Sequence, residues 1–250
     1  MAIDKAAGQA NAYFFLQPGV RHVVADLGLT DYKKVWALQK GIVASKIFWP
    51  EFPDVFLITE HHHIFTLGKG GKEENLLYLP ADVECLRVER GGDVTYHGPG
   101  QLVLYPIFDL KKNRMNLSQF LFLLEETAIG VLRHFGIEGK RLSINRGVFV
   151  EVRKIAFLGL SIRKHVTFHG LSINVNADLR YFSYINPCGF TGLEVTSVEK
   201  ETGRKVEMKQ VKAALFAEII KIFDASYPGK ESEPRFKGLH KETRSLTLSI

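Results

Sequence analysis

Residues 90–101 read Arg-Gly-Gly-Asp-Val-Thr-Tyr-His-Gly-Pro-Gly-Gln, and residues 102–107 continue as the apolar run Leu-Val-Leu-Tyr-Pro-Ile. Four glycines and a proline in twelve residues argue against a packed helix or an ordinary strand. The glycines allow positive φ and close approach of the backbone to another group. A polar turn between two strands is the simpler alternative. The density of glycines and polar side chains beside a buried strand favours a substrate-binding loop on a rigid sheet.

This loop lacks the known phosphate-binding patterns. It contains no Gly-x-x-x-x-Gly-Lys-Ser/Thr and no Gly-x-Gly-x-x-Gly that opens a helix. The Arg-Gly-Gly triplet at 90–92 occurs once and is flanked by apolar segments, unlike a disordered RNA-binding repeat. The loop therefore gives no support for nucleotide binding.

Composition is that of an ordinary soluble globular protein of 250 residues, with 46% hydrophobic and 24% charged residues. No stretch approaches the roughly 20 apolar residues of a membrane helix, and Met1–Ala10 lacks the pattern of a secretory signal. Two cysteines, Cys85 and Cys188, are expected to be free thiols in a cytoplasmic protein. The net charge of +6 is dispersed and does not by itself identify a partner.

Apolar periodicity predicts helices over residues 30–48, 117–135 and 207–223. The second is the clearest, because Asn116 can cap it and Gly136 can close it. Shorter apolar segments predict strands, and residues 60–71 read as a polar loop. The predicted strands cover residues 55–59, 85–88, 102–107, 148–152, 155–162 and 171–175. Helices mixed with consecutive strands indicate a mixed α/β (α+β) fold with a partly antiparallel sheet.

Cys188 lies in Ile-Asn-Pro-Cys-Gly, where a proline and a glycine hold the thiol on a tight turn. Cys85 instead precedes an alternating segment and fits a structural thiol. A nucleophilic thiol needs a nearby cation or base, and the sequence offers Lys154, His97 and His169. The histidines at 61–63 lack the spacing of a metal site, so no metal is expected.

Several motifs, in order and with compatible spacing, resemble the lipoyl (octanoyl) transferase family over roughly residues 55–200. The match includes the spacing of 34 positions from Lys154 to Cys188. Glu60-His61 and Thr66-Leu67-Gly68 resemble an upstream motif of the family. The remaining motifs are the whole of 90–101, Lys-Ile-Ala-x-x-Gly at 154–159, His-Gly-Leu at 169–171, Asn174 with Leu179, and Ile-x-Pro-Cys-Gly at 185–189.

The resemblance implies a single-domain α/β (mixed α+β) enzyme on the fold of biotin and lipoate protein ligases, with helices flanking a mixed sheet. It implies residues 1–227 as the octanoyltransferase domain and leaves 228–250 as a polar tail. Such an acyltransferase moves an octanoyl or lipoyl group from acyl carrier protein to a lysine ε-amine. The implied acceptors are lipoyl domains of 2-oxoacid dehydrogenase E2 subunits and the glycine cleavage H protein. A monomer without a cofactor is expected, with neither nucleic acid nor membrane as partner.

Carried over by position, Cys188 would form the acyl thioester and Lys154 would promote ionisation of its thiol. Once Cys188 is acylated, Lys154 could serve as the base for the incoming amine. The residues expected to line the acyl pocket are Arg90, Gly91, Gly92, Asp93, Val94, Thr95, Tyr96, His97, Phe157, Leu158, Gly159, Gly170, Leu171 and Ser172.

Two other functions stay open at the level of sequence. A ligase of the same fold would activate free lipoate or biotin with ATP and would need no nucleophilic cysteine. A basic nucleic-acid-binding module would form no acyl adduct and would bind with steep salt dependence.

Overall fold

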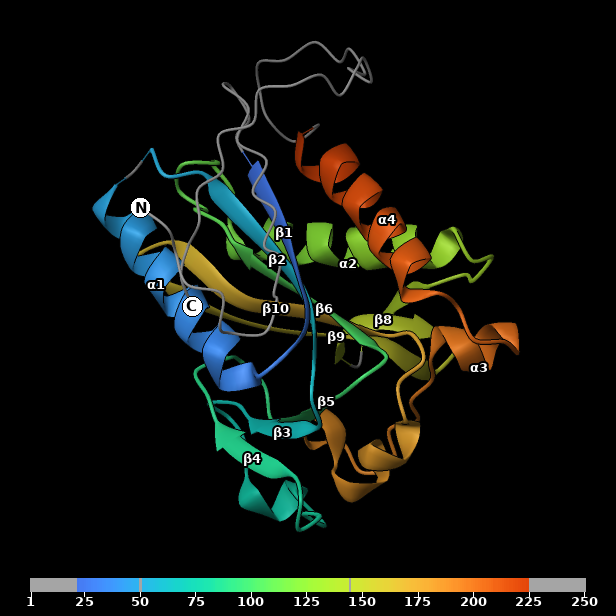
Figure 1. Cartoon of the computed structure of the whole chain (residues 1–250). Helices are drawn as coiled ribbons and strands as arrows, with labels where there is room; N and C mark the ends of the chain where they lie inside the picture. Colours follow the sequence, from blue (N-terminus) through green and yellow to red (C-terminus); the bar gives the residue numbers. More distant parts are fainter. Residues whose placement is uncertain (1–21, 50, 144, 225–250) are drawn as a thin grey trace, which may run out of the picture.

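The computed structural model describes residues 22–49, 51–143 and 145–224 (Figure 1). Within these ranges seven strands form a central sheet in the order β1-β2-β6-β10-β9-β8-β7. β1 and β2 pair in parallel and the other neighbours pair antiparallel, which confirms the predicted mixed sheet. The strands are β1 (His22–Thr30), β2 (Asp54–His61), β6 (Gln101–Ile107), β7 (Lys140–Leu142), β8 (Asn145–Val150), β9 (Arg153–Arg163) and β10 (Val166–Asn174).

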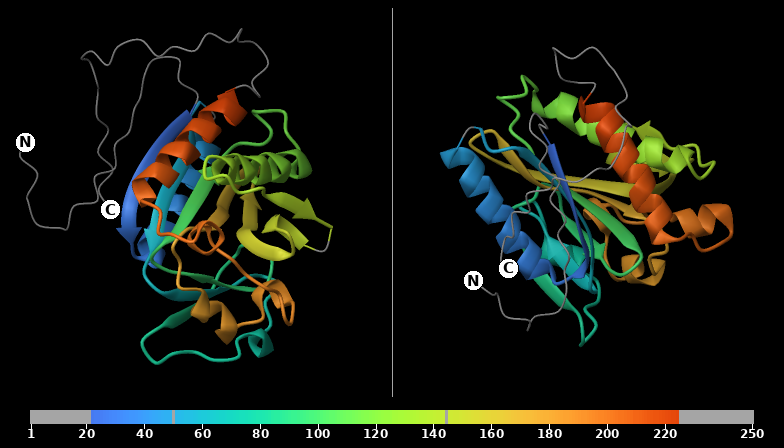
Figure 2. Two further views of the ribbon diagram at one scale, coloured as in Figure 1. Left: turned by 90° about the vertical axis from the view of Figure 1, so that its right-hand side faces the viewer. Right: turned by 45° about the horizontal axis from the view of Figure 1, so that its top comes forward.

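Helices cover both faces of this sheet (Figure 2). Phe56 and Ile58 of β2 pack with α2 (Leu117–Arg133) and α4 (Met208–Ile219). Val55 and Leu57 of the same strand pack with α1 (Tyr32–Phe48) on the opposite face. Because successive strand residues point to opposite faces, a strand buried on both sides is apolar without interruption.

Local signals fix the helix ends close to the predicted positions. The Asp31 side chain accepts a hydrogen bond from the Lys34 backbone N–H and begins α1. Asn116 and Gln119 form a capping box at the start of α2. The predicted helix over 207–223 is α4, which continues as a π-helical turn over Ile220–Asp224. A shorter helix, α3 (Val198–Thr202), precedes it.

A second sheet in the described part, in the order β4-β3-β5, lies below the main sheet (Figure 1). Its strands are β3 (Ile64–Leu67), β4 (Glu84–Arg87) and β5 (Val94–His97). The prediction of an unbroken polar loop over 60–71 is therefore wrong, and so is the exclusion of a strand from 90–101. Backbone pairing with β3 and complete burial of Val94 and Tyr96 stabilise β5 despite the surrounding glycines.

The sequence pattern does not predict β1 or the short β7. The predicted polar tail, residues 228–250, lies outside the described residues. Across the described ranges, no helix combines the length and apolar character needed to cross a membrane.

Candidate active site

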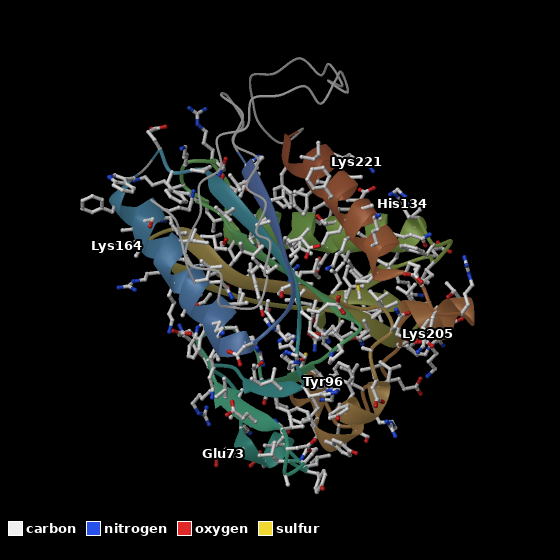
Figure 3. All side chains as sticks on the ribbon, viewed as in Figure 1. Glu73, Tyr96, His134, Lys164, Lys205 and Lys221 are labelled. Carbon is white, nitrogen blue, oxygen red and sulfur yellow. The ribbon has the colours of Figure 1, made fainter. Side chains whose placement is uncertain are left out.

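A pocket lies where the two sheets meet, and its volume is about 460 Å³ when the part open to solvent is included. The predicted loop residues Arg90–Asp93, Thr95 and His97 line it, as do 157–159 of β9 and 170–172 of β10. Val94 and Tyr96 do not line it. Both are fully buried in the apolar cluster of the small sheet, where Tyr96 lies (Figure 3).

Four further lining residues are absent from the predicted set, and three of them lie outside the family motifs. They are Tyr32 at the start of α1, Val103 and Tyr105 of β6, and His169 of β10, which the sequence suggested only as a thiol activator. Period-two alternation along β6 is a signal for two of them. Leu102 and Leu104 pack on the α2 side, so Val103 and Tyr105 face the pocket side.

Cys188 lies on a short 3₁₀ turn, Pro187–Gly189, at one end of the pocket. Its φ of +59° is unusual for a residue other than glycine, and Gly189 follows with φ +77°. The turn is attached to the glycine loop through Asn75. The Asn75 carbonyl accepts from the Asn186 N–H at 2.8 Å, and the Asn75 side chain donates to Asp93 Oδ2 at 2.7 Å. The geometry therefore couples the position of the thiol to that of the loop.

Lys154 is the second residue of β9 and has no exposed surface. Its Nζ lies 3.6 Å from Cys188 Sγ and donates to the Arg146 carbonyl at 2.6 Å. Burial lowers the pKa of Lys154, whereas the nearby charges of Cys188 and Glu125 raise it. The backbone of Lys154 is hydrogen-bonded to residues 194–196. Its N–H donates to the Glu194 carbonyl at 2.8 Å, and its carbonyl accepts from the Thr196 N–H at 2.9 Å. The side chain is thus held beside the thiol.

The two histidine candidates are placed differently. His97 Nδ1 lies 2.6 Å from Gln101 Oε1, and burial lowers the pKa of His97 to about 3. His169 Nε2 lies 3.6 Å from Glu89, and burial lowers the pKa of His169 to about 4. Both rings are therefore neutral near pH 7. Of the three candidate activators, Lys154 is the one with a hydrogen bond to the thiol in the described structure.

Arg90 anchors the glycine loop. Its buried guanidinium donates to the carbonyl and hydroxyl oxygens of Thr66 and to the Gly91 carbonyl. Gly68 lies directly beneath the loop, where a Cβ atom would be 2.3 Å from the Gly92 carbonyl oxygen. Close approach of two backbone segments explains why glycine follows Thr66-Leu67.

The three adjacent histidines diverge. His61 is buried, with Nε2 2.8 Å from the Tyr105 hydroxyl. His63 bonds to the Tyr96 hydroxyl and stacks on Tyr181, while His62 is exposed. No group of three or more metal-binding side chains comes together among the residues that the structure describes.

Solved structures of similar fold include lipoate protein ligases. A putative lipoate protein ligase from T. acidophilum superposes with a TM-score of 0.62 at 18% identity, covering 78% of this chain and 83% of that one. A lipoate-protein ligase A bound with ATP gives 0.61 at 15% identity, covering 82% and 85%. These identities establish the fold alone, and they confirm the ligase-like architecture that the motifs implied.

Sequence relatives are closer. An octanoyltransferase from Desulfotalea psychrophila is 41% identical over 207 residues, covering 80% of this chain and 93% of that protein. An octanoyltransferase from Gloeobacter violaceus is 42% identical over 200 residues, covering 80% and 90%. Residues 31–220 match the family described as the lipoyl protein ligase A/B catalytic domain. The chain therefore belongs to this family and, within it, to the octanoyltransferases.

Proposed function

We propose that this acyltransferase takes an octanoyl group from acyl carrier protein and attaches it to a lysine of a lipoyl domain through a thioester on Cys188. The observation that carries the proposal is the 3.6 Å contact between Lys154 Nζ and Cys188 Sγ at the end of the pocket. A buried ammonium beside a thiol stabilises the thiolate, which is the nucleophilic form.

In the first step the Cys188 thiolate attacks the thioester carbonyl of the donor. The bond between the acyl carbon and the donor sulfur breaks, and the octanoyl group is then bound to Sγ. The departing thiolate takes a proton from the Lys154 ammonium, which leaves a neutral amine. The lowered pKa of the buried lysine favours this release.

In the second step the amine of the acceptor lysine attacks the Cys188 thioester. An amide bond forms, the carbon–sulfur bond breaks, and Lys154 takes up the proton that the amine loses. The thiolate and the ammonium are thereby restored. Replacement of a thioester by an amide is downhill, so the cycle needs no ATP.

The lining of the pocket suits an acyl chain. Val103, Phe157, Leu158 and Leu171 supply apolar surface. Gly159 and Gly170 allow close approach of the glycine loop and of β6, because a Cβ atom would lie 3.0 Å from the Gly91 carbonyl oxygen or 2.1 Å from the Leu104 carbonyl oxygen. Burial of an apolar chain is favourable by about 0.8 kcal/mol for each methylene group. The other lining residues of the loop and of β10, through Ser172, complete the proposed acyl site.

The proposed acceptors are the lipoyl domains of E2 subunits and the glycine cleavage H protein, and the proposed enzyme is a cytoplasmic monomer. The formal charge of +6 favours association with an acidic acyl carrier protein. Membership of an enzyme family sets aside the non-enzymatic binding module. An ATP-dependent ligase activity is the remaining alternative, because a solved structure of similar fold is a ligase bound with ATP.

The experiment supplies octanoyl-acyl carrier protein and a lipoyl domain without ATP, and measures the mass of the lipoyl domain. We expect one octanoyl group per domain with the wild type and with Cys85→Ser, and none with Cys188→Ser. Free octanoate with ATP should give no product. Product that requires ATP, or that persists in Cys188→Ser, would favour the ligase alternative.

A further inference from the structure

Glu125 is a buried carboxylate of α2 that the proposed reaction does not use. It is 1% exposed. Its Oε2 accepts from Arg141 Nε at 2.8 Å, and the Arg146 guanidinium lies 3.8 Å away. Its Oε1 accepts from the Gly147 backbone N–H at 3.1 Å. Carboxylates are rarely buried so completely unless they are paired.

One peptide group connects this carboxylate to Lys154. The Gly147 N–H points to Glu125, and the carbonyl of the same peptide group, that of Arg146, accepts from Lys154 Nζ at 2.6 Å. A carboxylate bound to the N–H polarises the peptide group and strengthens its carbonyl as an acceptor.

The backbone at this point is adapted to the lysine. Gly147 has φ +134°, a conformation that residues with a side chain rarely adopt. A Cβ atom there would lie 2.7 Å from Lys154 Cε and 2.4 Å from the Ala156 carbonyl oxygen. A substitution would therefore push the peptide group away from the lysine.

We propose that Glu125 is a positioning residue, which acts through the Arg146–Gly147 peptide group to fix the Lys154 ammonium against Cys188 and to stabilise its charge. This inference rests on the proposed function, in which Lys154 gives up and takes back a proton. It adds a buried acid of α2 to the group that surrounds Lys154.

The charges around Lys154 determine the direction of the effect. The Cys188 thiolate and Glu125 favour the ammonium, and burial opposes it. On the far side of Glu125, Arg141 and Arg146 partly neutralise the carboxylate. Once Cys188 is acylated its charge is gone, and Glu125 becomes the main group that favours the ammonium. Removing the Glu125 charge should then release the Lys154 proton at lower pH.

The test isolates the acyl-enzyme and measures the rate of octanoyl transfer to the lipoyl domain as a function of pH. In Glu125→Gln, which keeps the shape of the side chain, the rising limb should move to lower pH by about one unit. The matched control is Glu126→Gln, because Glu126 is the next residue of α2, contacts the same Arg141 and is partly exposed. Its profile should coincide with that of the wild type.

If Glu125→Gln does not fold, a second variant for which the opposite shift in pH is expected takes its place. Arg141→Met removes a cation that partly neutralises Glu125, so Glu125 should favour the Lys154 ammonium more strongly. The rising limb of the pH–rate profile should therefore move to higher pH. Profiles that do not move in the folded variants, or a uniform loss of rate at every pH, would overturn the inference and leave Glu125 a structural residue. If the wild type forms no acyl-enzyme, it is the proposed function that fails, before the variants are compared.

Discussion

Lys154→Met removes the ammonium beside Cys188 while keeping most of the side chain. Lys154 Nζ and Cys188 Sγ are 3.6 Å apart. At an effective dielectric constant of about 20, a thiolate and an ammonium at this distance attract each other by about 5 kcal/mol. Burial of the ammonium opposes part of this attraction, as the lowered pKa of Lys154 indicates.

Each 1.36 kcal/mol of attraction left after the cost of burying the ammonium multiplies the ratio of thiolate to thiol by ten. A free cysteine is only about 3% ionised at pH 7, so full ionisation raises reactivity at most about 30-fold. We therefore expect Lys154→Met to slow alkylation of Cys188 by iodoacetamide, by up to about 30-fold at pH 7. The difference should shrink as the pH rises, because the variant thiol then ionises without help.

The assay is the rate of alkylation between pH 5 and 10 in a Cys85→Ser background, so that one thiol is followed. Lys154→Arg is the matched control, because it keeps the positive charge but does not release a proton near neutral pH. It should retain much of the alkylation rate and lose acyl transfer to the lipoyl domain. Superimposable alkylation curves for the wild type and Lys154→Met would refute the assignment of Lys154 as the group that ionises the thiol.

Three further predictions concern the loop, the helix and the buried histidines. Gly68→Ala should abolish transfer by displacing the loop, because its Cβ would lie 2.3 Å from the Gly92 carbonyl oxygen. Gly41→Ala in α1, where a Cβ meets nothing within 4 Å, should keep activity and raise the thermal midpoint, since alanine favours an exposed helix by about 1 kcal/mol. Burial lowers the pKa of His97 to about 3 and that of His61 to about 4, whereas a histidine of the unfolded chain has a pKa of about 6.5. Between these values the two rings are protonated in the unfolded chain but not in the folded protein, so acid favours unfolding. Urea unfolding should therefore show a loss of up to about 2 kcal/mol per ring from pH 7 to 5, and an unchanged free energy of unfolding would contradict it.

Much of the fold follows from local patterns. The apolar period of α2, with Asn116 and Gly136 at its ends, predicts that helix because burial and capping agree. The strand β5 is not predicted by its local pattern, because glycines flank it on both sides. It is stabilised instead by pairing with β3 and by burial of its side chains. Non-local contacts of this kind leave no periodic signal in a four-residue segment.

The proposed site divides in the same way. The Pro-Cys-Gly turn is visible in the sequence, and the family motifs relate its Cys188 to Lys154 across 34 positions. Glu125 has no such signal. It lies in a helix whose pattern shows an ordinary acidic pair, and its role depends on a backbone N–H that only the folded chain brings to it. Tyr32 likewise reaches the pocket from a helix terminus.

The measurement that tests the central claim most directly is the intact mass of the protein after incubation with octanoyl-acyl carrier protein and no acceptor. The account predicts one added octanoyl group, located on Cys188, removed by hydroxylamine and passed to a lipoyl domain added afterwards. It should be absent from Cys188→Ala and present in Cys85→Ala, since burial raises the pKa of the Cys85 thiol and keeps it un-ionised. Octanoyl transfer without any adduct, or an adduct that survives Cys188→Ala and vanishes in Cys85→Ala, would contradict the account.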